Sequence, residues 1–110
     1  MSAKEAPLVA LLGRGATYGG DLRFEGPVRI DGTFKGRVYT EDVLEIGEGG
    51  LVDGEIDAAT LVVSGTAAGR IHARDRLVLA ATGALRGTVD AGSIEVAPGA
   101  RIDATLKVGA

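Results

Sequence analysis

The chain has 110 residues, enough for one domain with a modest core, and its 45% apolar content is too high for a disordered chain. Its formal net charge is -3, so no basic field favours nucleic acid as a partner. The absence of cysteine excludes a disulfide framework and a thiolate metal site, and it is typical of a reducing compartment.

The N-terminal segment leads into an apolar run from Pro7 to Leu12. This run of six residues is too short for the core of a signal peptide or for a membrane span. We therefore expect a protein of the cytoplasm, with residues 1–8 as a flexible tail, residues 9–108 as the folded domain and residues 109–110 as a short C-terminal end.

Alternating apolar or small residues first appear at Tyr18, Gly20, Leu22 and Phe24, and similar sets begin at positions 34, 52, 67, 85 and 102. The steps between the sets are 16, 18, 15, 18 and 17 residues. A spacing of two within each set, with largely polar residues between, predicts strands with one buried face. The Gly near the centre of nearly every set argues against helices.

A second, shorter series of apolar pairs lies between these sets. Its steps are 16, 17, 16 and 17 residues, so both series share a mean period near 17. Such a shared period indicates a structural repeat. The pairs are Val28/Ile30, Leu44/Ile46, Leu61/Val63, Leu77/Leu79 and Ile94/Val96.

The repeat predicts an all-β, single-domain parallel β-helix of about six coils, with three short strands in each coil. Asp31-Gly32 and Asp53-Gly54 are also compatible with hairpin turns, which leaves a meander of hairpins as the structural alternative. A meander does not need like residues to recur in every coil, whereas a parallel β-helix stacks them into ladders about 4.8 Å apart.

Glycine recurs at one position of the repeat, which predicts a corner or a crowded interior position without space for a Cβ atom. The stretch IGEGGLVDG, residues 46–54, has counterparts at residues 12–20 and 96–104, as expected if every coil bends at the same corner. The turns differ in length, which is typical of surface loops. The glycine column comprises Gly20, Gly36, Gly54, Gly69 and Gly87.

No catalytic motif emerges from the sequence. Gly13-Arg14-Gly15 and Gly47-Glu48-Gly49 lack the third glycine of a dinucleotide fingerprint, and no Walker loop is present. The only histidine, His72, lies between two inward positions and is expected on the surface. Asp53, Glu55 and Asp57 alternate among arginines, which favours a solvated face of mixed charge over a calcium or acid–base site. We expect no cofactor, no metal and no small-molecule substrate.

Both ends of the predicted β-helix are apolar and lack an obvious cap of charges, proline or helix. An open, repeating end is a template for another copy of itself. We therefore expect end-to-end polymerisation without nucleotide. The expected polymer interface comprises Leu11, Leu12, Tyr18, Leu22, Phe24, Ile94, Val96, Ile102, Leu106 and Val108.

The block LLGRGATYGGDLRFEGPVRIDGTFKGRV (11–38), followed by GEIDA, GRIHA and GTVDA, resembles the bactofilins. The resemblance covers about residues 9–108. It implies a right-handed parallel β-helix and a bacterial cytoskeletal protein that forms non-polar filaments through contacts between like ends. It also implies scaffolding of cell-wall, polarity or chromosome-organising proteins, and inner-membrane association through the N-terminal tail. The candidate membrane contacts here are Lys4, Leu8 and Val9.

Two other functions remain open from the sequence. A left-handed β-helix acyltransferase has an aliphatic residue every six positions and a catalytic histidine, whereas these steps vary from 15 to 18 residues and the lone His72 is expected to face outward. A monomeric binding module would present exposed aromatic residues. Tyr39 is the one clear candidate, because Tyr18, Phe24 and Phe34 belong to inward series.

Overall fold

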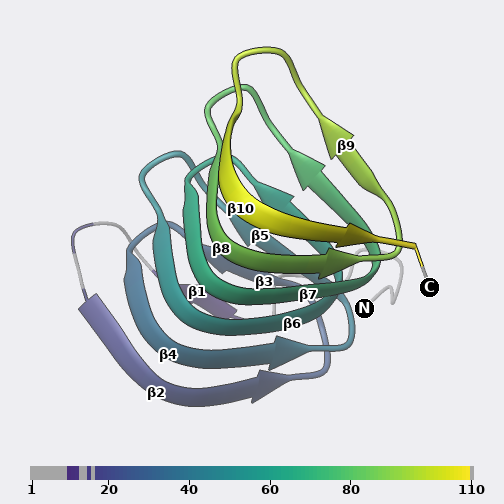
Figure 1. The fold of residues 1–110 in the computed structure, drawn as a ribbon. Helices are drawn as coiled ribbons and strands as arrows, with labels where there is room; N and C mark the ends of the chain where they lie inside the picture. Colours follow the sequence, from purple (N-terminus) through teal and green to yellow (C-terminus); the bar gives the residue numbers. More distant parts are fainter. Residues whose placement is uncertain (1–9, 13–14, 16, 110) are drawn as a thin grey trace, which may run out of the picture.

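The computed structural model describes residues 10–12, 15 and 17–109, and in this part of the chain every strand pairing is parallel and no helix occurs. The chain winds as a parallel β-solenoid, which confirms the predicted fold class (Figure 1). A meander of hairpins is excluded, because it would need antiparallel pairs. The strands are β1 (Ala10–Leu12), β2 (Thr17–Phe24), β3 (Val28–Ile30), β4 (Thr33–Thr40), β5 (Val43–Ile46), β6 (Leu51–Val63), β7 (Thr66–Leu79), β8 (Ala84–Ala91), β9 (Ile94–Val96) and β10 (Arg101–Val108).

Strand register follows the sequence repeat. In the short-strand series, Leu44 pairs with Leu61, Leu61 with Leu77, and Leu77 with Ile94. Each of these side chains stands over a like side chain of the next coil, so the apolar residues form a continuous ladder inside the solenoid. The ladder explains why the sequence repeats its residue types as well as its turns.

The described residues make about five turns, not the six coils expected. Six copies of the long strand are present, in β2, β4, the first parts of β6 and β7, β8 and β10, and six stacked copies enclose five complete intervals. Two of the three expected strands of a coil run continuously through the bend at the glycine column. In β6 and β7 the strand also continues into the next short segment.

The glycine column forms the bend of each long strand. Its members have φ values between 102° and 141°, a region that residues with a side chain rarely adopt. A Cβ atom on Gly54 would collide with the carbonyl oxygen of Gly36 in the coil below, and the same relation repeats between Gly69 and Gly54. Both predicted reasons for the column therefore apply. Ala104 occupies the sixth position of the column, above Gly87. Among the described residues, only glycines have a positive φ.

The core consists of the inward side chains of the stacked coils. Phe34, Leu44, Leu61 and Leu77 are among those with no exposed surface. Thr40 is the buried polar residue of this core; its hydroxyl donates to the carbonyl oxygen of Gly26 at 2.7 Å and accepts from the amide of Asp42 at 3.2 Å. The coil walls cover the core on its sides, so only the two ends of the stack can leave it open.

The corner between each short strand and the following long strand varies in length. It contains two residues before β4 and β7, and four before β6, β8 and β10. The four-residue corners close with a backbone hydrogen bond, as from the amide of Gly50 to the carbonyl of Gly47 at 2.9 Å. These corners follow one another along one edge of the solenoid (Figure 1). The stretch IGEGGLVDG, which begins at Ile46, contains the corner before β6.

Candidate functional site: the end coils and the charged side

The two ends of the strand stack carry unpaired edges. In the described residues, β1 pairs only with β3, β2 only with β4, β9 only with β7 and β10 only with β8. An edge strand presents a row of backbone N–H and C=O groups without partners and is a ready template for another chain. Each end of the solenoid therefore offers both hydrogen-bonding groups and apolar side chains.

The C-terminal end exposes the interior ladder. Ile102 is 38% exposed and Leu106 is 39% exposed, whereas their partners one coil below, Leu85 and Val89, are 1% and 0% exposed. Val108 reaches 58% exposure. These residues are the exposed large hydrophobic side chains of the described chain, together with Val96 at 48%. Four of the predicted interface residues thus form one apolar face, with the half-buried Ile94 beside it.

The N-terminal end is better covered. Tyr18, Leu22 and Phe24 lie in β2, are half-buried and pack against the core. Leu11 and Leu12 lie in β1, and the placement of their side chains falls outside the described part, as do Lys4, Leu8 and Val9 altogether. The predicted interface residues therefore belong to two separate sets at opposite ends of the strand order.

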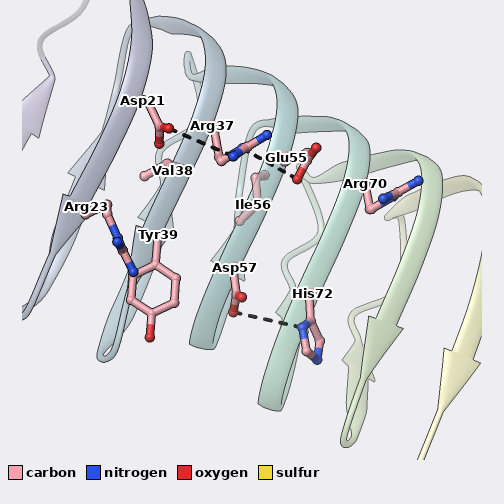
Figure 2. A pocket seen from close by; sticks show the side chains of 10 residues that line it. All are labelled: Asp21, Arg23, Arg37, Val38, Tyr39, Glu55, Ile56, Asp57, Arg70 and His72. Carbon is pink, nitrogen blue, oxygen red and sulfur yellow. Dashed lines mark ion pairs between the residues drawn. The ribbon is translucent and has the colours of Figure 1, made fainter.

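The side of the solenoid carries outward charges of alternating sign. Arg37 lies between Asp21 and Glu55 of the two neighbouring coils, with N–O distances of 3.9 Å and 3.7 Å, and Arg70 follows in the same column (Figure 2). The sequence predicted only a solvated face of mixed charge. The alternation could have been found by aligning the outward positions on the period of 17, because a coil spacing near 4.8 Å makes like charges in one column repel.

Tyr39 occupies a second column on this side. The guanidinium carbons of Arg23 and Arg74 lie 5.1 and 5.4 Å from the centre of its ring, which is cation–π distance. The sequence predicted an exposed aromatic residue, and the structure shows a half-buried ring between two cations. Asp57 and His72 follow in the column, and the face encloses a hollow of about 430 Å³ (Figure 2).

All the carboxylates that line this hollow lie within 4 Å of a cation or a histidine. Asp57 lies 3.5 Å from Arg74 and 3.9 Å from His72, whose side chain is 48% exposed, as expected for a surface histidine. On another face, hydrogen bonding to Asp31 and the charge of Glu45 raise the pKa of Arg29, so its guanidinium stays charged. No group of three or more His, Cys, Asp or Glu side chains suited to a metal occurs among the described residues. The arrangement is suited to fixing coil register and docking a charged partner.

Within the described ranges there is also no helix that is long and apolar enough to cross a membrane.

Comparison with known proteins agrees with this geometry. A similar solved structure is the bactofilin of Thermus thermophilus, reconstructed by cryo-electron microscopy as double helical filaments. The two chains share 32% sequence identity over 89% of this chain and 99% of that chain, with a TM-score of 0.79. No curated protein sequence matches. The family model of bactofilin, described as polymer-forming cytoskeletal, matches residues 10–107, and the chain therefore belongs to the bactofilin family.

Proposed function

We propose that this protein is a non-enzymatic cytoskeletal subunit that polymerises end to end into non-polar filaments without nucleotide. The observation that carries the proposal is the C-terminal face, where Ile102, Leu106 and Val108 continue the core ladder into solvent. An uncovered apolar end with free backbone groups gains both hydrophobic burial and strand pairing when it meets another copy.

Assembly without nucleotide is supported by the kind of interface available. The sequence contains no phosphate-binding loop, and the exposed contacts at the C-terminal end are apolar side chains and strand edges, which are ready in the folded subunit. No hydrolysis step is needed to expose them. The filament would then be controlled by subunit concentration and by partners.

We assign the filament to the bacterial cytoplasm as a scaffold for cell shape, polarity or the placement of other proteins. Its charged side, with Tyr39 between Arg23 and Arg74, supports docking of cell-wall or polarity proteins along the filament. Lys4, Leu8 and Val9 are the proposed contacts with the inner membrane. This part of the proposal rests on family membership and on the composition of the tail.

Negative-stain electron microscopy of the untagged protein, without added nucleotide or metal, tests the proposal directly. We expect long thin filaments or sheets. Leu106→Arg and Phe24→Arg should abolish them while the far-ultraviolet circular dichroism spectrum stays that of the wild type, because a buried charge at an end junction is costly.

Ala81→Arg is the matched control. Ala81 is an exposed residue of a corner turn, so the added charge remains in water and filaments should persist. Uniform small particles of the wild-type protein at all concentrations and salts would contradict the filament function. That result would favour a monomeric binding module that uses the hollow beside Tyr39.

A further inference from the structure

We propose that the C-terminal ends of two copies join through antiparallel pairing of β10 with itself, with Thr105 at the two-fold axis. In this register Asp103 of each copy lies opposite Lys107 of the other. The inference rests on the proposed function, because it requires the solenoid ends to be the assembly surfaces. It adds the strand direction at the C-terminal junction and the residues that set the register.

The backbone of β10 shows which groups are free at this end. The amide of Arg101 donates to the carbonyl of Gly83 at 3.0 Å, and the amide of Gly109 donates to the carbonyl of Ala91 at 2.9 Å. Odd-numbered residues therefore direct their N–H and C=O groups toward the coil below. Because successive residues of a strand direct these groups to opposite sides, residues 102, 104, 106 and 108 direct theirs out of the open end.

The interior ladder restricts the register. Ile102, Leu106 and Val108 stand over the buried Leu85, Val89 and Ala91, so they face the core, and the odd-numbered residues between them face outward. An antiparallel junction must place inward residues opposite inward residues. With Thr105 on the axis, residue 102 meets 108 and residue 104 meets 106. Residues 102, 104, 106 and 108 of one copy, whose backbone groups point out of the open end, then form hydrogen-bonded pairs with the same four residues of the other copy.

The outward charges select among the registers that the ladder allows. The register centred on Thr105 places Asp103 opposite Lys107 twice, once on each side of the axis. A register centred on Ala104 places Arg101 opposite Lys107, and one centred on Asp103 places the two Asp103 carboxylates together. Directly opposite like charges destabilise strand pairs and opposite charges stabilise them. Among the registers that pair most of β10, only the one centred on Thr105 brings opposite charges together; Arg101 then lies opposite Gly109. Asp103 and Lys107 are both exposed and thus free to make these pairs.

Charge also disfavours the joining of unlike ends. If a second copy simply continued the coil pattern, its β2 would lie on β10 in the register that β4 takes on β2. Lys107 belongs to the same outward column as Arg23. The junction would therefore place the cation of Arg23 next to that of Lys107 in that column, where the other neighbours of these two residues are Tyr39 and Asp90.

A single engineered cysteine tests the register, because the chain has none of its own. In a non-hydrogen-bonded antiparallel pair the Cα atoms are about 4.5 Å apart, within the range of about 4.4–6.8 Å that a disulfide spans. Thr105→Cys should therefore yield a covalent dimer on oxidation. Thr88→Cys is the matched control, since Thr88 is the partner of Thr105 one coil further in. Its two copies would be about 14 Å apart, three strand spacings.

The Thr105→Cys protein is first examined by electron microscopy under reducing conditions. Filaments without a disulfide on oxidation, or equal cross-linking of Thr105→Cys and Thr88→Cys, would overturn the register and leave the proposed function standing. Absence of filaments from the wild-type protein would overturn both.

Charge exchange provides a second test. Asp103→Lys or Lys107→Asp alone places like charges opposite each other at both pairs, and the concentration needed for assembly should rise about tenfold or more. An equimolar mixture of the two variants restores opposite charges at both pairs, and assembly should recover. If Lys107→Asp alone assembles better than the wild type, the end-to-tail junction with Arg23 is correct and the proposal is wrong.

Discussion

The middle coils and the terminal coils of this solenoid have the same residue pattern but opposite environments. Leu85 in β8 and Ile102 in β10 are register partners, yet the first is 1% exposed and the second 38% exposed. In both strands the alternation of apolar and polar residues directs every second side chain toward the interior. The difference shows that burial here depends on a coil being present on each side, and that the last coil is complete only when something covers it.

The N-terminal end differs from both. Its aromatic side chains, Tyr18 and Phe24, pack back against the core and are half-buried, although their strand, β2, pairs only with β4 among the described residues. The C-terminal end has smaller aliphatic side chains that are more exposed. The larger unsatisfied apolar surface among the described residues therefore lies at the C-terminal end, where exclusion of water by a second copy would change the environment most.

The glycine column gives the largest expected difference between middle and end. Gly54→Ala places a Cβ against the backbone of Gly36 and forces a side chain into a positive φ of 139°. Strain and overpacking together should lower the free energy of unfolding by about 2–6 kcal/mol. Gly20→Ala has the strained φ of 111° but meets no atom within 4 Å, so about 1–3 kcal/mol is expected.

Urea unfolding followed by circular dichroism, at a protein concentration below assembly, measures both variants. Equal destabilisation by Gly54→Ala and Gly20→Ala would show that φ alone explains the column. It would also show that close stacking of the coils contributes nothing.

The apolar ladder gives the next effect. Leu85→Ala removes a fully enclosed side chain and should lower the free energy of unfolding by about 2–5 kcal/mol. Ile102→Ala removes a side chain that is already 38% exposed, so the isolated subunit should lose only about 1 kcal/mol. In assembly the order reverses: Ile102→Ala should raise the concentration needed for filaments, while the folded fraction of Leu85→Ala should assemble like the wild type.

Sedimentation of filaments over a concentration series, beside the same unfolding measurement, separates the two effects. If Ile102→Ala leaves the assembly concentration unchanged, the exposed ladder is not the junction. If it destabilises the subunit as much as Leu85→Ala does, the terminal coil is not open in solution.

The period of the sequence predicted most of the fold because each coil buries residues at the same positions. Leu61 and Leu77 could be assigned to the core from spacing alone, and both are fully buried. Val96 and Leu106 have the same local pattern as residues of the buried coils, so their exposure could be expected only from their place near the end of the stack. The stacking of Tyr39 between Arg23 and Arg74 also escaped prediction, because it joins three coils whose residues are 16 to 51 positions apart in the chain.

The corner turns of unequal length have a consequence for how the protein could vary. At the glycine bend the backbones of successive coils lie too close for a Cβ atom, so added residues there would break the stack. The corners before β6, β8 and β10 already contain two more residues than those before β4 and β7, and the neighbouring ladders keep their register. This edge can therefore carry peptide inserts without disturbing the core. A polymer of such subunits would display the inserts at regular intervals along its length.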